Sequence, residues 1–223
     1  YFGLILYKIS IKNNLHTFFH NQKDRNLFIN NNVVFKNNSS IIFGSGIDLK
    51  KYNFSKVRET NSDSLVFLYI GRIIKDKGII EYIEALKLIK EEYPFIKFKF
   101  IGSLVNDNKS NLSYSFFNDL IKQRLIEHHH FKNNIIEDLI HCDCVVLPSY
   151  REGLPKSLIE SSAIGRAMIA SNVPGCNDIV IDQYNGLLFE VKNVKSLYQV
   201  LKKFINLDKA KRIAMSLNAN KDL

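Results

Sequence analysis

Several features that define common protein classes are missing from this 223-residue sequence. The three cysteines, Cys142, Cys144 and Cys176, are too few for a disulfide framework and lack the spacing of a zinc site. We therefore expect the reduced thiols of an intracellular protein. No apolar run reaches the roughly 20 residues that a membrane-spanning helix needs. The apolar segment 1–7 is short, and no basic region precedes it, so it does not resemble a signal peptide.

The composition is that of an ordinary globular protein, with 46% hydrophobic and 24% charged residues. The length suits one full domain and part of another. Because the first residue is tyrosine rather than methionine, we expect the chain to be a piece of a longer protein.

The charge balance is basic, with a formal net charge of +9 and a pI of about 9.3. It favours anionic partners, such as nucleotides, phospholipid surfaces or nucleic acid; the alternative is a set of solvated lysines. A nucleic-acid-binding protein would interleave aromatic and basic residues on one surface. No convincing pattern of that kind occurs, so we expect no nucleic-acid partner.

From Leu65 onward, strand-like and helix-like segments alternate. The predicted strands are Val66–Ile70, Phe98–Ile101, Glu127–Phe131, Cys144–Leu147, Ala167–Ala170 and Leu187–Phe189. The predicted helices are Gly78–Glu92, Tyr114–Glu127, Asn134–His141, a segment that ends at Gly165, Asn193–Asn206 and Asp208–Asn218. This pattern predicts an α/β fold in which a parallel sheet is covered on both faces. The polar stretch Val105–Ser113 is predicted to be a loop.

Residues 1–46 do not fit the same repeating unit. Leu15–His20 and Ile41–Phe43 are typical of strands, and Lys23–Asn30 of a helix. We interpret 1–46 as the tail of another α/β domain, the polar segment 47–64 as a linker, and 65–223 as a nearly complete second domain.

Two glutamates, Glu152 and Glu160, bracket the turn between a strand and a helix. In open α/β sheets, ligands bind at that end of the strands. Pro155 suits the first position of the helix, and the free amides of Gly153 and Leu154 would then point at an anion. Carboxylates beside an anion-binding turn indicate a ligand with both phosphates and hydroxyls, such as a nucleotide sugar.

Five segments together resemble glycosyltransferase family 4. They are Phe43-Gly-Ser-Gly-Ile-Asp48, Phe67-Leu-Tyr-Ile-Gly-Arg-Ile-Ile-Lys-Asp-Lys-Gly78, Leu147-Pro-Ser-Tyr-Arg-Glu-Gly-Leu-Pro-Lys-Ser-Leu-Ile-Glu160, Gly165-Arg-Ala-Met-Ile-Ala-Ser-Asn-Val-Pro-Gly-Cys176 and Asn185-Gly-Leu-Leu-Phe189. The second resembles the "GR…KG" motif of that family and the third its E-x7-E motif. Each is weak alone, but all five occur in the family's order, from about Thr17 to Asn220.

The resemblance implies the GT-B architecture, in which two Rossmann-like domains enclose the active site. It implies a retaining enzyme that needs no metal or cofactor and uses a nucleotide-sugar donor, which we expect to be a UDP-sugar. The implied acceptor is a glycan or a lipid-linked oligosaccharide in surface polysaccharide biosynthesis. The implied place is the cytoplasm, with a peripheral contact at the inner face of the cytoplasmic membrane.

The resemblance implies that most of the acceptor domain lies outside this sequence, so we expect the fragment alone to bind donor without transferring sugar. A non-catalytic or truncated sugar-nucleotide-binding protein is the alternative.

Arg72 and Lys77 follow the strand Val66–Ile70 at its carboxyl end. By resemblance they clamp the donor diphosphate and act in catalysis, because fixed cations stabilise the charge that develops on a leaving diphosphate. The alternative is two solvated loop charges, and Lys75 is expected to be solvated in either case.

Glu160, by the same resemblance, binds the ribose hydroxyls, and Glu152 contacts the donor sugar or stabilises positive charge at its anomeric carbon. Gly153 and Leu154 offer backbone amides to phosphate, and a side chain at Gly153 would obstruct that approach. The alternatives are an exposed helix glutamate at Glu160 and an ion pair between Glu152 and Arg151. Retention can follow two displacements or a same-face route guided by the leaving phosphate; the family is generally assigned the second.

The run His128-His-His130 invites a metal-binding interpretation, but neighbours in a straight strand point to opposite faces. We therefore expect no metal site there, and no Asp-x-Asp motif occurs. Gly44-Ser-Gly46 is too short for a dinucleotide fingerprint. A group of late basic residues could contact anionic lipid or form a solvated helix face: Lys202, Lys203, Lys209, Lys211 and Arg212.

Overall fold

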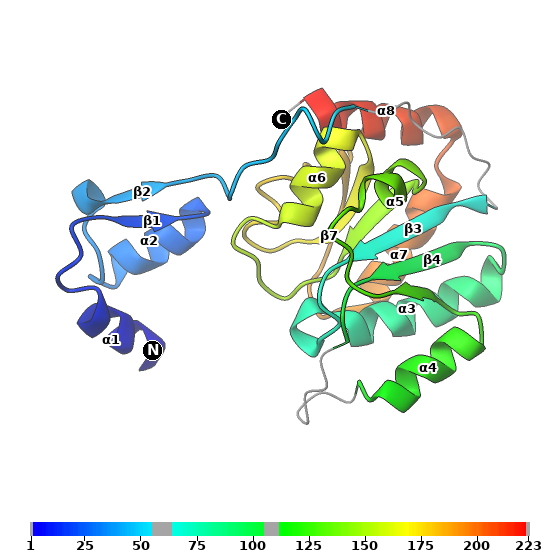
Figure 1. The fold of residues 1–223 in the computed structure, drawn as a ribbon, viewed down its shortest axis with the longest axis horizontal. Coiled ribbons are helices and arrows are strands. Elements are labelled where there is room, and N and C mark those ends of the chain that lie inside the picture. Colours follow the sequence, from blue (N-terminus) through cyan, green and yellow to red (C-terminus); the bar gives the residue numbers. More distant parts are fainter. Residues whose placement is uncertain (1, 55–63, 105–111, 222–223) are drawn as a thin grey trace.

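The computed structural model describes residues 2–54, 64–104 and 112–221. A small unit at the N-terminal end is joined by an extended segment to a large α/β unit (Figure 1). The sequence predictions for 55–63 and 105–111, which belong to the linker and to the polar loop, lie outside the described residues.

The large unit is built on a six-stranded sheet with the order β5-β4-β3-β6-β7-β8, in which every pair of neighbours is parallel. Its strands are β3 (Val66–Ile70), β4 (Lys97–Ile101), β5 (Glu127–His129), β6 (Cys144–Leu147), β7 (Ala167–Ser171) and β8 (Gly186–Phe189). From the middle of the sheet, β3, β4 and β5 follow one another toward one edge, and β6, β7 and β8 follow one another toward the other edge. The order therefore reverses between β3 and β6, the type of position where Rossmann-like sheets bind ligands.

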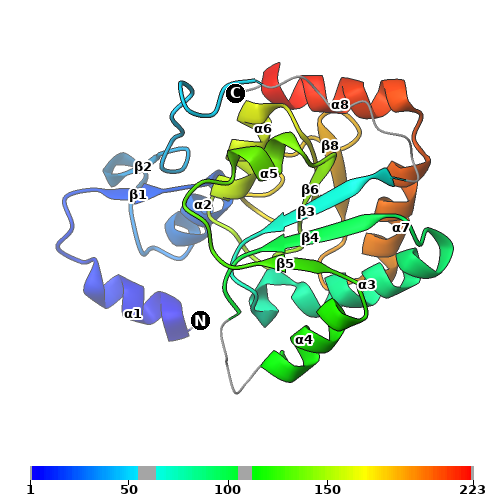
Figure 2. The same ribbon diagram turned by 45° about the vertical axis from the view of Figure 1, so that its right-hand side comes forward.

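Helices cover both faces of this sheet (Figures 1 and 2). They are α3 (Ile79–Glu92), α4 (Tyr114–Lys122), α5 (Ile136–Ile140), α6 (Lys156–Ile164), α7 (Val194–Asn206) and α8 (Lys209–Lys221). The helices α3, α4 and α7 lie on one face, and α5, α6 and α8 lie on the other. Because both faces are covered, every residue of β6 and β7 is buried, which explains their continuous apolar sequence.

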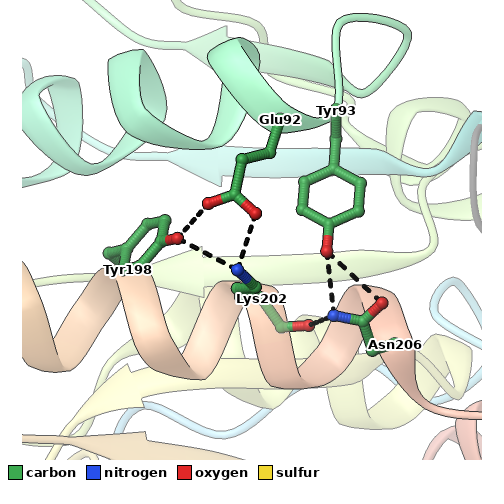
Figure 3. Close-up of polar contacts among 5 residues, drawn as sticks. All are labelled: Glu92, Tyr93, Tyr198, Lys202 and Asn206. Atoms are coloured by element: carbon green, nitrogen blue, oxygen red, sulfur yellow. Dashed lines mark hydrogen bonds and ion pairs between the residues drawn. The ribbon is translucent and has the colours of Figure 1, made fainter.

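Hydrogen bonds from side chains connect neighbouring helices at two places. On the surface, Glu92 of α3 accepts hydrogen bonds from Tyr198 and Lys202 of α7 (Figure 3). Beneath α5 and α6, the buried Arg166 donates to the carbonyls of Leu139 and Gly165 at 2.9 and 2.8 Å. A cation suits these positions because carbonyl groups at helix C-termini lack helical partners.

Several predicted element boundaries were wrong in this unit, among them the start of α5, which is Ile136 instead of Asn134, and the end of α8, which is Lys221 instead of Asn218. α4 ends at Lys122 instead of Glu127, because Arg124 adopts a left-handed conformation with φ of 56° and reverses the chain. The next strand, β5, ends at His129, two residues before the predicted end. α6 begins at Lys156, so Pro155 is its N-cap with ψ of 118° rather than its first helical residue.

The small unit contains a parallel β-α-β arrangement: β1 (Thr17–Phe19), α2 (Gln22–Asn30) and β2 (Ser39–Ile41), with a short 3-10 helix, Lys36–Asn38, before β2. The predicted last strand was placed two residues too late. A preceding helix, α1 (Phe2–Ser10), was not predicted, because the short apolar segment was considered only as a targeting sequence.

The basic residues near the C-terminal end do not form one solvated face. Arg212 is buried and donates to the carbonyl of Ile205, while Lys202 is paired with Glu92 at 2.6 Å. Within the described part of the chain, no helix is long and apolar enough to cross a membrane.

Candidate functional site

Two clefts lie at the carboxyl ends of the strands, where the strand order reverses. The Glu152 cleft, of about 600 Å³, is lined by Asp24, Arg72, Ile74, Asp76, Lys77, Tyr150, Arg151, Glu152 and Gly153. The Glu160 cleft, of about 430 Å³, is lined by Ile70, Gly71, Arg72, Ile101, Gly102, Ser103, Phe131, Lys132, Asn133, Ile135, Lys156 and Glu160. Arg72 lines both, so the two clefts are neighbours. Each has the volume of a small-molecule site.

Lys77 and Glu152 form an ion pair inside the Glu152 cleft. Their Nζ and Oε1 atoms lie 2.5 Å apart, and the two side chains are 21% and 12% exposed. Lys77 ends the 3-10 helix η3 (Lys75–Lys77), whereas Glu152 lies on the loop after β6. The structure thus brings together two predicted site residues that are 75 positions apart in the chain.

A close backbone contact holds these two segments in register. Gly78 has a φ of 67°, and a Cβ atom there would lie 1.9 Å from the carbonyl oxygen of Pro148. Nearby, the Tyr150 amide donates to the Asp76 carbonyl at 2.9 Å, and the Tyr150 hydroxyl donates to Glu81 at 2.6 Å. Only glycine fits at position 78, which gives a physical reason for the glycine that follows Lys77.

The alternative ion pair between Glu152 and Arg151 was wrong. Arg151 instead pairs with Asp24 of α2 at 2.7 Å. The buried Asn21 caps α2, and its side-chain amide donates both to Asp24 and to the Gly153 carbonyl, at 2.9 and 3.0 Å. The small N-terminal unit therefore contacts the same loop that carries Glu152.

Glu160 lies on α6 and is only 6% exposed, so it is not the solvent-exposed helix glutamate of the alternative interpretation. Burial raises the pKa of its carboxyl above the ordinary value, although Tyr52 and Lys156 act in the opposite direction. The Nζ atom of Lys156 lies 3.7 Å from Glu160 Oε1, and Lys156 also lines the Glu160 cleft. A buried carboxylate that opens into a cleft is suited to accept hydrogen bonds from a bound hydroxyl.

The turn before α6 offers backbone donors. Among the described residues, neither the Gly153 nor the Leu154 amide donates a hydrogen bond to another part of the chain. Within the chain, a Cβ atom at Gly153 would meet His20 at an ordinary 3.4 Å, so the protein itself leaves room for a side chain there, and the predicted obstruction of a phosphate stays a prediction. A contact within the chain does require glycine at Gly175, whose Cβ would lie 2.5 Å from the Gly153 carbonyl oxygen.

Of the three consecutive histidines, His128 has a structural contact. Its Nε2 atom lies 2.9 Å from the carbonyl oxygen of Gly102. Across 2–54, 64–104 and 112–221, no group of three or more histidine, cysteine or acidic residues could hold a metal ion.

The sequence analysis did not identify several residues that line the clefts: Asp24, which accepts a hydrogen bond from Asn21, and Asp76, Ser103, Phe131, Lys132, Tyr150 and Lys156. Most of these residues come shortly after the carboxyl end of a strand, and that position is the signal that could have identified them.

A third cavity, of about 520 Å³, lies between α1 and α2. Among the described residues its lining is mainly apolar and includes one charged side chain, that of Arg151, in contrast to the several charged side chains of the two clefts.

Comparison with known proteins gives a family match over most of the chain. Residues 50–222 match the model of the family described as glycosyl transferases group 1. The N,N'-diacetylbacillosaminyl-diphospho-undecaprenol alpha-1,3-N-acetylgalactosaminyltransferase of Campylobacter jejuni is 30% identical over 97% of this chain and 58% of its own length. The capsular polysaccharide biosynthesis glycosyltransferase CapM of Staphylococcus aureus is 30% identical over 86% of this chain and 52% of its own.

A solved structure has the same fold. The crystal structure of Anabaena Alr3699/HepE in complex with UDP-glucose gives a TM-score of 0.80 at 17% identity, covering 98% of this chain and 62% of that one. The predicted GT-B fold is thereby confirmed. The chain spans little more than half the length of these two curated relatives. It belongs to the glycosyl transferases group 1 family.

Proposed function

We propose that this chain is the donor-binding part of a retaining glycosyltransferase. The enzyme transfers a hexosyl or N-acetylhexosaminyl group from a UDP-sugar to a glycan or lipid-linked acceptor in surface polysaccharide biosynthesis. In this proposal, residues 65–223 form the nucleotide-sugar-binding domain, 1–46 belong to the acceptor domain, and 47–64 connect the two.

The observation that carries the proposal is the shared position of Arg72, which lines both clefts. A nucleotide sugar has two parts joined by a diphosphate. Its sugar fits the Glu152 cleft and its nucleoside fits the Glu160 cleft, with the diphosphate at the arginine between them. A guanidinium group suits this position because it can hydrogen-bond two phosphate oxygens at once.

The chemistry assigned to each residue follows from the charge that develops during transfer. As the glycosidic bond to the diphosphate breaks, negative charge grows on the leaving oxygen and positive charge on the anomeric carbon. Arg72 and Lys77 stabilise the first, together with the amides of Gly153 and Leu154. Glu152 faces the sugar and stabilises the second.

Glu160 is assigned to the ribose. Its carboxylate accepts hydrogen bonds from the two hydroxyls, and it orients the nucleoside without touching the reacting atoms. Burial supports this role, because a hydrogen bond made away from water is stronger than one at the surface.

The names of the relatives support the acceptor class. One is described as acting on an undecaprenol diphosphate-linked sugar, and another belongs to capsular polysaccharide biosynthesis. An acceptor with a lipid anchor requires a membrane surface, so we propose that the enzyme works in the cytoplasm at the inner face of the cytoplasmic membrane.

A transfer assay on the complete protein tests the proposal. UDP-hexoses and UDP-N-acetylhexosamines are offered with a lipid-linked acceptor, with and without excess EDTA, and the anomeric configuration of the product is read by NMR. We expect a retained configuration, and transfer that persists in EDTA because Arg72 and Lys77 supply the cationic charge. Donor binding without transfer would favour the alternative, a non-catalytic sugar-nucleotide-binding protein. Loss of transfer in EDTA with recovery on adding Mn²⁺ would contradict metal independence.

A further inference from the structure

A residue of the small N-terminal unit holds the carbonyl group of Gly153. The side-chain amide of Asn21, directly before α2, donates to that carbonyl oxygen at 3.0 Å. The two residues are 132 positions apart in the chain. Asn21 is only 1% exposed, so the donor is shielded from water, and a hydrogen bond made away from water is stronger than one at the surface.

Further contacts fix the orientation of the Asn21 side chain. Its Oδ1 atom accepts from the backbone amide of Asp24 at 2.7 Å, and its Nδ2 atom donates a second hydrogen to Asp24 Oδ2 at 2.9 Å. The other carboxylate oxygen of Asp24 pairs with Arg151 at 2.7 Å. A rotated amide would place an acceptor against the Gly153 carbonyl, so Asn21 can present only its Nδ2 atom to this loop.

The hydrogen bond from Asn21 also sets the direction of the next backbone amide. The Gly153 carbonyl and the Leu154 N–H belong to one peptide group, which is planar. It is also trans, because the described part of the chain contains no cis peptide bond. In a trans peptide group the C=O and N–H bonds point in opposite directions. The Leu154 N–H is therefore directed away from Asn21, and it donates to no other described residue.

The large unit holds the same loop by close packing and by charge. A Cβ atom at Gly175 would lie 2.5 Å from the Gly153 carbonyl oxygen and 2.9 Å from that of Glu152. Lys77 binds the Glu152 carboxylate at 2.5 Å. The loop is thus fixed between the two units. An amide that is fixed in advance loses little conformational freedom when an anion arrives, which favours binding.

We propose that Asn21 is a positioning residue of the anion-binding turn: by holding the Gly153 carbonyl, it aims the Leu154 amide at the diphosphate of the donor. The small unit thereby completes a phosphate site that the large unit otherwise builds. The hydrogen bond also polarises the peptide group, which makes the Leu154 N–H a better donor. This inference rests on the proposed function, because it requires a diphosphate at the turn.

Calorimetric titration of the 223-residue chain with UDP and with inorganic pyrophosphate tests the positioning. Asn21→Ser keeps an oxygen that can cap α2, but it removes the amide that reaches the Gly153 carbonyl. The variant should bind both ligands more weakly by the same factor, about two- to tenfold, the net contribution of one hydrogen bond. The ratio of the two affinities should stay that of the unmodified chain, because the change affects the diphosphate that both ligands share.

The matched control is Asn193→Ser. Asn193 caps α7 as Asn21 caps α2: its side chain accepts from the Ser196 amide at 2.9 Å and donates to Glu190 at 2.7 Å. The described linings of the two clefts do not include Asn193. Its replacement should leave both affinities unchanged. If Asn21→Ser and Asn193→Ser weakened binding alike, loss of a helix cap would explain the data, and the positioning role would be overturned.

The Leu154 amide itself gives a reading that a merely structural role of Asn21 would not change. In the ¹⁵N-labelled chain, saturation with pyrophosphate should move the Leu154 amide proton downfield, because it then donates to an anion. In Asn21→Ser the shift at saturation should be clearly smaller. If that variant does not fold, Asn21→Asp, which also keeps an N-cap oxygen, is measured in the same way. An equal shift in the folded variant and the unmodified chain would overturn the proposal.

The titration also separates this inference from the proposed function. If Glu160→Gln weakens UDP binding while Asn21→Ser binds UDP and pyrophosphate as tightly as the unmodified chain, the positioning is wrong and the proposed function stands. If the folded, unmodified chain binds no UDP, the proposed function is wrong, and the role of Asn21 fails with it.

Discussion

The Nζ atom of Lys77 lies 2.5 Å from the Oε1 atom of Glu152, so each charge is already paired within the chain. In the proposed mechanism, Lys77 faces the donor diphosphate, and Glu152 faces the donor sugar. Donor binding must therefore draw Lys77 toward the diphosphate, so the diphosphate and the Glu152 carboxylate compete for the Lys77 ammonium group. The pair orients both side chains in a partly buried cleft, where an isolated charge is unfavourable.

Glu152→Gln should separate binding from catalysis. Removal of the carboxylate releases Lys77 for the diphosphate, so UDP should bind this chain more tightly, by up to about fivefold or ~1 kcal/mol. In the complete protein the same change should lower kcat roughly a hundredfold, because the developing positive charge loses its partner. Calorimetry and a transfer assay measure the two effects. Weaker UDP binding together with unchanged kcat would contradict both roles.

Loss of either cation should impair transfer in the complete protein. Arg72→Ala and Lys77→Ala should each lower kcat/KM by about a hundredfold, equivalent to ~3 kcal/mol of transition-state stabilisation. Lys75→Ala is the matched control, since Lys75 is exposed and belongs to the same 3-10 helix as Lys77. It should leave kcat/KM nearly unchanged. If all three variants behaved alike, a general effect of charge would explain the data and a diphosphate clamp would not.

Gly78→Ala should be strongly destabilising. The left-handed conformation disfavours any side chain by about 1–2 kcal/mol. In addition, a Cβ atom would lie 1.9 Å from the Pro148 carbonyl oxygen, so the loop toward Glu152 must move. We expect a loss of about 3 kcal/mol or more in urea denaturation. Gly46→Ala provides the comparison: its φ is 70°, but nothing lies within 4 Å of the added atom, so only the conformational cost applies. Equal losses in the two variants would show that the Pro148 contact is unimportant.

Glu160 should make the stability of the chain depend on pH. Burial raises the pKa of Glu160 in the folded state above the ordinary 4.5. Below pH 4.5 the carboxyl is protonated in both states and carries no penalty. As the pH rises through the raised pKa, the folded chain must ionise a buried group, and its free energy of unfolding falls.

Glu160→Gln removes this ionisation, so the variant should be more stable than the unmodified chain at pH 7, and the difference should shrink toward pH 4. Urea denaturation at the two pH values measures it. Glu84→Gln, at an exposed position of α3, is the control and should show a much smaller difference. A Glu160→Gln variant that is less stable at pH 7 would mean that hydrogen bonds to the carboxylate outweigh its burial.

The sheet could be predicted well from the sequence because its strands are continuous apolar runs. Val66–Ile70 and Cys144–Leu147 were predicted with the bounds that the structure gives. A strand buried on both faces does not alternate between apolar and polar residues, so it stands out in the sequence as a continuous apolar run. The end of α4 could not be predicted, because Arg124 adopts a left-handed conformation that no local signal of the sequence announces.

The site was only partly predictable for a related reason. Arg72, Lys77, Glu152 and Glu160 lie in recognisable segments, and the structure places all four in two adjoining clefts. The partners of these residues depend on tertiary packing between segments that are far apart in the sequence. The Asp24–Arg151 pair joins positions 127 residues apart, so no spacing rule could have identified it.

The assignment of Glu160 to the ribose is the central claim, and one titration tests it most directly. The purified chain is titrated with UDP and with dUDP, which lacks one ribose hydroxyl. The loss of one hydrogen bond to a charged group costs about 1.5–3 kcal/mol, so UDP should bind about tenfold to hundredfold more tightly than dUDP. Glu160→Gln should reduce this preference. Equal affinity of the folded chain for UDP and dUDP would contradict the account.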